Sequence, residues 1–240
     1  MPCPFGQGIF QRSKHMNYKK KFAALLLAVL TLSCAACSNS ETDPKTTDSA
    51  ASSEIENLDI GSGLEITSVG SYAGLYVEDG SDETVSDVFY IRVKNTGESD
   101  LQYAHISLTR GEESYEFDIS TLPVGETLQA LELTRRAMPE NTAELNASVT
   151  LYAAFDEPLS MHEDIFEVTT SDNTVNIKNN SDSTFSQVYV YYKNSSGDTL
   201  IGGITYRAGV QNLAPGQTLS CYTSHYSEGS SRLLFVTYAS

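Results

Sequence analysis

Few residues of this sequence could do chemistry once the first 36 positions are set aside. The three histidines, His105, His162 and His225, lie far apart in the sequence. Beyond residue 36 we find no Gly-x-Ser-x-Gly turn, His-Glu-x-x-His pair, Cys-x-x-Cys pair or phosphate-binding glycine loop. The sequence therefore predicts no catalytic residue, no cofactor and no enzyme activity.

His105 and Cys221 have simple structural interpretations. His105 falls on the polar phase of an alternating run that contains Ile106 and Leu108, so we expect a surface imidazole. Cys221 shares the phase of Leu219 in its own run, which predicts a buried, unreactive thiol.

Two groups of carboxylates are candidates for calcium. Asp79 and Asp82 belong to the acidic run 78–83, and Asp156 and Glu157 stand near the middle of the chain. Calcium prefers oxygen ligands, but neither group has the ligand spacing of a dedicated calcium loop. We therefore expect solvated carboxylates and no metal site, with calcium binding kept as the alternative.

Tyrosines of the last third of the chain are candidates for a binding surface. Tyr189 and Tyr191 should lie on the opposite face of their strand from Val188 and Val190. A tyrosine ring gives a large contact area at a small entropic cost, although cross-strand tyrosines also stabilise sheets. The candidate binding residues are Tyr189, Tyr191, Tyr206, Tyr222 and Tyr226.

The elements that carry these residues are predicted to be strands. Short runs of alternating apolar residues follow position 60 and are separated by Gly, Asn, Asp and Ser, whereas no segment after Leu58 keeps a helical period. The sequence thus predicts an all-β protein. One run should present a single apolar face made of Ala147, Val149, Leu151, Ala153 and Phe155.

An internal repeat divides the chain. The run VKNTGES at 93–99 matches IKNNSDS at 177–183, and LPVGETL at 122–128 matches LAPGQTL at 213–219. The offset is 84 residues at the first match and 91 at the second, so the second copy holds about seven extra residues, which we place near 202–207. Gly125 and Gly216 are expected to adopt positive φ. We predict two tandem immunoglobulin-like β-sandwich domains, at 60–157 and 163–240.

The order of these motifs supports a resemblance. A strand, Lys-Asn, a polar turn, a second strand and then LAPGQT resemble the small Ig-like modules, including the FxLYD type, of lipoproteins from Gram-positive bacteria. No FxLYD string occurs in this chain. The resemblance implies extracytoplasmic binding or spacing rather than catalysis.

The first 59 residues resemble the start of a bacterial lipoprotein. Residues 17–21 (NYKKK) are cationic, residues 22–32 (FAALLLAVLTL) are uncharged and too short to span a bilayer, and SCAACS follows. The resemblance implies a signal peptide and a lipidated Cys37, with Cys34 as the alternative. We expect Met16 to be the true start, residues 1–36 to be an upstream extension plus the signal peptide, and 37–59 to be the lipidated cysteine and a disordered acidic tether.

Composition limits the partners. Loss of the first 36 residues would remove five of the 15 basic residues and none of the 31 acidic ones, so the net charge would change from −16 to −21. We therefore expect no nucleic acid as a partner. The lipoprotein resemblance implies that a palmitate-type lipid anchor holds the chain at the membrane.

The sequence favours an extracytoplasmic, membrane-anchored lipoprotein without enzyme activity that binds or scaffolds an envelope protein or a glycan. A purely structural spacer is the first alternative, and a solute-binding or enzymatic accessory subunit is the second.

Overall fold

The computed structural model describes residue 55, residues 57–81 and residues 83–240. These residues form strands, turns and loops and contain no helix, which confirms the all-β prediction. No membrane-spanning helix is found among them. The predicted signal peptide, the start at Met16 and both candidate lipidation residues, Cys34 and Cys37, lie outside the described residues.

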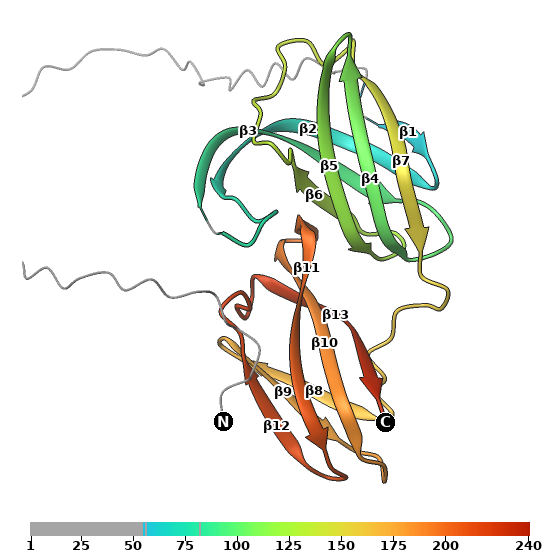
Figure 1. The fold of residues 1–240 in the computed structure, drawn as a ribbon, viewed down its shortest axis with the longest axis vertical. Coiled ribbons are helices and arrows are strands. Elements are labelled where there is room, and N and C mark those ends of the chain that lie inside the picture. Colours follow the sequence, from blue (N-terminus) through green and yellow to red (C-terminus); the bar gives the residue numbers. More distant parts are fainter. Residues whose placement is uncertain (1–54, 56, 82) are drawn as a thin grey trace, which may run out of the picture. The chain divides into compact units, whose positions relative to one another are not determined.

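Thirteen strands follow one another along the described chain (Figure 1). Those of the first half are β1 (Leu58–Gly61), β2 (Leu64–Leu75), β3 (Thr84–Asn95), β4 (Leu101–Arg110), β5 (Glu113–Leu122), β6 (Thr127–Leu131) and β7 (Asn146–Ala154). Those of the second half are β8 (Phe166–Ser171), β9 (Thr174–Asn179), β10 (Phe185–Ser196), β11 (Thr199–Leu213), β12 (Thr218–Tyr222) and β13 (Ser231–Ala239).

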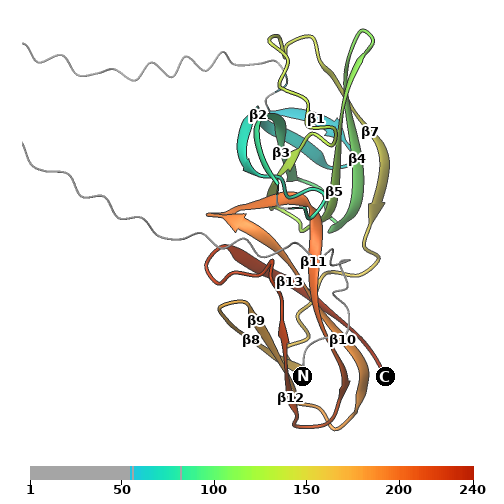
Figure 2. The same cartoon turned by 60° about the vertical axis from the view of Figure 1, so that its left-hand side comes forward.

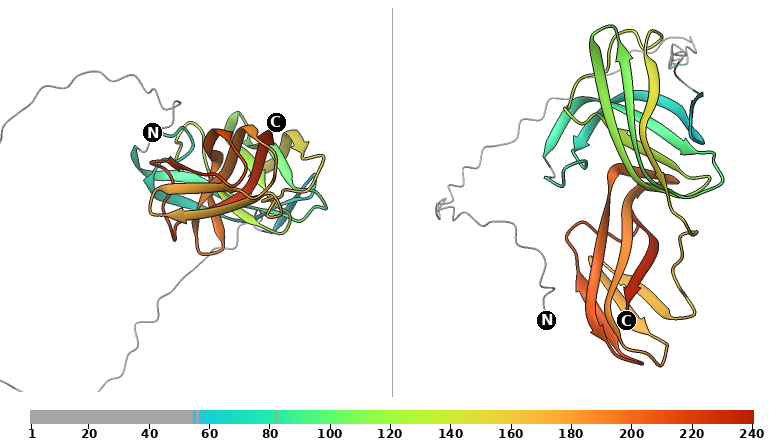
Figure 3. Two further views of the ribbon diagram at one scale, coloured as in Figure 1. Left: turned by 90° about the horizontal axis from the view of Figure 1, so that it is seen from below. Right: turned by 45° about the vertical axis from the view of Figure 1, so that its right-hand side comes forward.

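The two halves repeat one connectivity. In the first half β2, β3 and β6 pair in that order and β5, β4 and β7 form the facing sheet. In the second half β8, β9 and β12 correspond to the former set, and β11, β10 and β13 to the latter. Each half therefore builds its two layers from the same succession of strands (Figure 3). The division into two independent domains stays a prediction.

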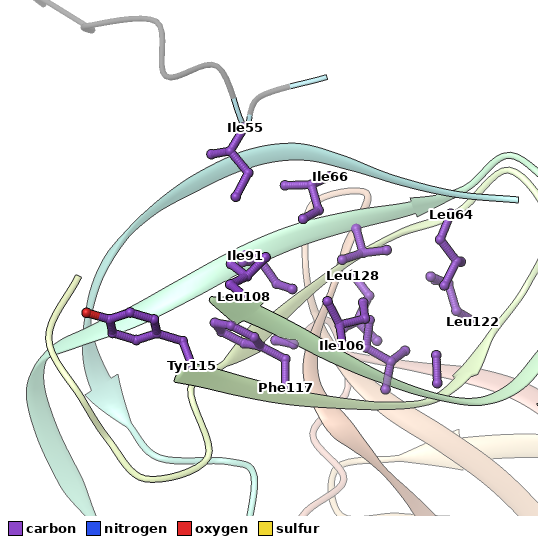
Figure 4. Packing of buried hydrophobic residues seen from close by; sticks show 14 of the residues in the cluster. Ile55, Leu64, Ile66, Ile91, Ile106, Leu108, Tyr115, Phe117, Leu122 and Leu128 are labelled. Carbon is purple, nitrogen blue, oxygen red and sulfur yellow. The ribbon is translucent and has the colours of Figure 1, made fainter. Parts of the chain in front are cut away.

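Each half has a hydrophobic core between its layers. In the first half Ile66 and Ile91 point from one sheet toward Ile106 and Phe117 of the other (Figure 4), and all four are fully buried. Ile55 joins this core at 1% exposure, and β1 begins at residue 58. The fold therefore starts a few residues before the end at 59 that we expected for the tether. A separate cluster around Val188, Val190 and Tyr192 fills the second half.

The repeated Lys-Asn motif ends in a buried asparagine. The side-chain amide of Asn95 donates to the carbonyl oxygens of Ser99 (3.0 Å) and Leu122 (2.9 Å), and its oxygen accepts from the N–H of Gly97 (3.0 Å). The N–H of Gly125 donates to the Asn95 carbonyl at 2.8 Å, and this glycine has φ 80. One side chain thus fixes the end of β3, the polar turn and the Pro/Gly turn.

Asn179 makes the same contacts in the second half. Its amide donates to the carbonyl oxygens of Ser183 (2.7 Å) and Leu213 (3.2 Å), and its oxygen accepts from the N–H of Ser181 (2.9 Å). The N–H of Gly216, at φ 69, donates to the Asn179 carbonyl at 2.9 Å. The positive φ predicted for both turn glycines is confirmed. We call each asparagine with the backbone groups it bonds an asparagine clamp, and the need for this clamp explains why the Lys-Asn and Pro/Gly motifs recur.

The single apolar face predicted for β7 is wrong at its centre. Val149 pairs with buried Ile106, but Leu151 pairs with His105, so Thr150 is an extra residue in the ladder. Such a β-bulge shifts the alternation by one position. Leu151 consequently turns to the outer face and is 60% exposed.

The extra residues of the second copy lengthen its central hairpin, visible as β10 and β11 in Figure 2. In that hairpin Tyr192 pairs with Tyr206 and Asn194 pairs with Ile201, so residues 202–205 loop out of the ladder. The bulge lies within the predicted 202–207 region but holds only part of the insertion, because β10 and β11 are also longer than β4 and β5. The end of the hairpin pairs in parallel with β6, and Leu200 lies opposite Leu128. The pairing joins strands of both halves into one seven-stranded sheet.

Candidate functional site

A tyrosine face covers one side of β10 and β13. Val188 and Val190 are buried on the core side of β10, and Tyr189 and Tyr191 lie partly exposed on the other, which confirms the predicted alternation. Antiparallel pairing places Thr237 of β13 opposite Tyr189. We define the tyrosine face by Gln187, Tyr189, Tyr191, Thr237 and Ala239, which line a common depression. Tyr238 also lines it, but this residue pairs with Val188 and packs its ring on Phe166 and Phe185.

The two central rings of this face are held in fixed orientations. The Tyr191 ring stacks on Phe235 with 4.3 Å between centroids and 1° between planes, and Phe235 in turn packs on Phe155 at 5.5 Å. The guanidinium of Arg207 lies 4.4 Å from the centroid of the Tyr189 ring. Stacking and cation–π contacts of this kind each contribute about 1 kcal/mol. The rings therefore form a rigid, preorganised platform.

The depression at the tyrosine face is shallow, and the charged group beside it is the Arg207 guanidinium on the Tyr189 ring. Its volume is about 220 Å³. Pockets that enclose small molecules usually measure roughly 300 to 1,000 Å³. The lining offers aromatic rings, hydroxyl groups and one amide, Gln187, but no ionisable carboxylate or amine. Such a surface suits contact with a protein or a glycan better than enclosure of a small substrate.

Two of the candidate tyrosines belong to the core. Tyr226 is 4% exposed and packs edge-on against Tyr192 at 5.3 Å. Tyr206 is partly buried and stacks between Tyr192 (5.6 Å) and His225 (4.8 Å). A ring buried at 4% exposure cannot contact a partner, so Tyr226 is not part of a binding surface.

Tyr222 lies apart from the other candidates. It is the last residue of β12, and 71% of its surface is exposed. β12 belongs to the sheet with β9 and β8, whereas the tyrosine face belongs to the sheet that contains β10 and β13. The structure brings Tyr189 and Tyr191 together, and places the other three candidates elsewhere.

An arginine pairs with two carboxylates of the acidic loop 78–83. Arg135 donates to a carboxylate oxygen of Asp79 at 2.9 Å and of Glu83 at 2.5 Å, and its guanidinium lies 4.4 Å above the ring of Tyr76. Asp79 is therefore engaged by an intramolecular cation. Asp82 falls outside the described residues.

The second pair of calcium candidates lies near the link between the halves. Asp156 and Glu157 are both exposed. Across residues 57–81 and 83–240 no group of three histidine, cysteine or carboxylate side chains is arranged to hold a metal ion.

His105 is more enclosed than the sequence suggested. Its Nδ1 lies 2.7 Å from a carboxylate oxygen of Asp118, and its Nε2 lies 2.9 Å from one of Glu116. Tyr103 donates its hydroxyl to the same Asp118 oxygen at 2.6 Å. Burial acts to lower the pKa of His105, but the hydrogen bonds to both carboxylates outweigh it and raise that pKa. Both ring nitrogens are occupied, so the imidazole links β4 to β5.

A buried glutamate connects the two halves. One carboxylate oxygen of Glu78, from the loop between β2 and β3, accepts the N–H of Leu131 at 2.8 Å. The other accepts the N–H of Gly203, in the bulge of β11, at 2.5 Å. Burial raises the pKa of Glu78 to about 7, although both backbone donors oppose the rise. A Cβ atom on Gly203 would lie 1.9 Å from the carbonyl oxygen of Asp118, so this position has room only for glycine.

A buried lysine completes the junction. Lys193 has no exposed surface, and its ammonium donates to the carbonyl oxygens of Gly202 (3.0 Å), Gly203 (3.0 Å) and Ile204 (2.6 Å). Burial lowers the pKa of Lys193 to about 7, and the nearby Glu78 opposes this. We call these two residues and the bulge 202–205 the junction site. It stabilises the looped-out backbone and ties it to the first half.

Sequence reasoning missed the junction site. Lys193 follows an alternating run that would have ended at the surface, and only the Gly202-Gly203 pair hinted at a close backbone approach. Sequence reasoning did predict the buried thiol, since Cys221 is 4% exposed.

Comparison of the chain with models of known protein families gives no match, and neither does comparison with curated proteins.

Proposed function

We propose that this chain is a non-enzymatic binding protein, held at the extracytoplasmic face of the cell membrane by lipid on Cys37, and that the tyrosine face is its contact surface. The rigid, partly exposed pair of Tyr189 and Tyr191 carries the proposal. Rings fixed before binding lose little conformational entropy when a partner arrives.

The chemistry of the face favours an envelope protein as the partner. The residues that line the depression are uncharged, and the adjacent Arg207 is positive in a chain that is strongly acidic as a whole. The contact therefore depends on ring area and hydroxyl hydrogen bonds, with one cation at its side. A glycan is the alternative ligand, because sugars also stack on aromatic rings. The sequence contains no tryptophan, which makes the glycan the weaker choice.

A quantitative pull-down from an envelope extract tests the proposal. The full-length chain should retain a partner, and the double substitution Tyr189→Ala with Tyr191→Ala should lose it. Tyr152→Ala is the matched control, because Tyr152 is 45% exposed on β7, outside the tyrosine face. Retention of the same partner by the double variant would exclude the tyrosine face as the contact surface.

A spacer is the second candidate function, and one observation favours it. Both halves are linked by the parallel pairing of β6 with β11 and by the hydrogen bond from the N–H of Gly203 to the Glu78 carboxylate. Such a link suits a rigid spacer better than a protein that binds a ligand. If no partner is captured and the tyrosine variants change nothing, the spacer is the better description.

A further inference from the structure

The repeat places β6 and β12 in equivalent positions, but their outer edges differ. Each strand follows a Pro/Gly turn and pairs with the strand that ends in Lys-Asn, β3 or β9. Both begin with Thr-Leu, at Thr127 and Thr218. The outer edge of β6 is paired with the hairpin end of β11, whereas β12 is the last strand of its sheet.

The backbone of β12 presents hydrogen-bonding groups at this edge. The N–H of Asn179 donates to Gln217 and the N–H of Thr223 donates to Asn173, so the odd-numbered residues of β12 turn toward β9. In an antiparallel ladder the residues between them point their N–H and C=O groups the other way. The backbone N–H and C=O groups of Ser220 and Tyr222 therefore point away from β9, toward the outer edge.

The residues at the equivalent outward positions of β6 have binding partners. There Gln129 pairs with Ile201 of β11, and the N–H of Leu131 donates to Glu78. Gln129 is 5% exposed and Leu131 is fully buried. Their counterparts in the repeat are Ser220, which is exposed, and Tyr222, which is 71% exposed. The second copy thus keeps the acceptor geometry and lacks the cover.

We propose that the outer edge of β12 is a strand-acceptor site, and that it binds the hairpin end of another β-sandwich protein in parallel, as β6 binds β11. Exposed edges of this kind recruit extended strands from partners. The bound strand should be uncharged and apolar, because β11 offers Leu200 and Ile201 at the equivalent contact. The exposed ring of Tyr222 would pack on it.

A second copy of this chain is a poor occupant. The β10–β11 hairpin end is already paired with β6 of its own chain. The β4–β5 hairpin ends in the ion pair between Arg110 and Glu113, which is charged at the place where an apolar strand is needed. Neither of these hairpins suits the site, and we therefore assign the donor to a different protein.

The test uses the full-length chain and a fluorescent, head-to-tail cyclic peptide with the sequence of residues 194–201, followed by fluorescence anisotropy. We expect saturable binding. Ser220→Pro should weaken it about tenfold, because proline removes an outward N–H while leaving the ladder to β9 intact. Ser220→Ala keeps the backbone and should bind as the unmodified chain does.

Two further variants keep the result decisive. Tyr222→Ser removes only an exposed ring, so it should fold normally and bind the peptide more weakly by about fivefold. The Tyr189→Ala and Tyr191→Ala variant should bind the peptide normally, which separates this surface from the tyrosine face. Absence of saturable binding at millimolar peptide would overturn the proposal. So would binding of the Ser220→Pro and Tyr222→Ser variants as tight as that of the unmodified chain. A peptide that displaced β11 from β6 would give the latter result.

Discussion

Replacement of Asn179 by alanine should destabilise the fold strongly. The side chain has no exposed surface, and the carbonyl oxygen of Leu213 that it serves is shielded from water as well. The substitution removes two donors, which serve the carbonyl oxygens of Ser183 and Leu213, and one acceptor, which serves the N–H of Ser181. Two backbone groups of the 181–183 turn and one at the end of β11 lose this partner at once.

The magnitude follows from these three contacts. A hydrogen bond contributes about 1 kcal/mol net, and a buried group left without a partner costs roughly 1 to 3 kcal/mol. Some of the affected groups lie near the surface of the turn and regain water, so we expect a loss of about 3 to 4 kcal/mol in the free energy of unfolding. Single domains are stable by only about 5 to 15 kcal/mol, so the change is large.

Urea denaturation followed by circular dichroism measures this loss. Asn95→Ala should cost the same within about 1 kcal/mol, because Asn95 makes the corresponding contacts in the first half. Asn180→Ala is the control, since Asn180 is exposed and adjacent, and should change the free energy by less than about 0.5 kcal/mol. A loss below about 1 kcal/mol for Asn179→Ala would refute the clamp as the cause of the repeat.

Three more predictions concern the junction site and the anchor. Burial raises the pKa of Glu78 from 4.5 to about 7, which removes stability as pH rises between those values, and lowers the pKa of Lys193 from 10.5 to about 7, which removes stability as pH falls between those values. The quantity to measure by urea titration is the free energy of unfolding of the wild type minus that of the double variant Glu78→Gln with Lys193→Met. This difference should have a minimum near pH 7, and a maximum there would contradict the reasoning. Gly203→Ala should cost about 2 kcal/mol or more in the same assay, because its Cβ would lie 1.9 Å from a carbonyl oxygen of β5, and a neutral result would disprove the close approach. Metabolic labelling with an alkyne fatty acid should mark the chain and the Cys34→Ala variant but not Cys37→Ala, and the reverse pattern would identify Cys34 as the lipidated residue.

Local patterns in the sequence were sufficient for the fold class and for the repeat. Alternation reports which face of a strand is buried, so the spacing alone separates Val188 and Val190 from Tyr189 and Tyr191. A glycine after a proline-bearing turn reports positive φ without long-range information, as at Gly216. These features depend on a few neighbouring residues, which is why they could be predicted.

The candidate surface was only partly predictable, because burial depends on what packs from elsewhere. Tyr226 and Tyr222 have similar local sequences of small polar residues, yet one is 4% and the other 71% exposed. The bulge at Thr150, which turns Leu151 outward, is set by the register with β4 and not by the composition of β7.

The sequence by itself determined an all-β chain, its duplication and the place of some of the inserted residues. Only the tertiary structure decided what the insertion does. Glu78 accepts the N–H of Gly203 from 125 positions away, and Lys193 becomes buried because the looped-out backbone supplies three carbonyl oxygens. A charged side chain looks like a surface residue until distant groups that can satisfy it are brought into contact, and that proximity is a property of the fold alone.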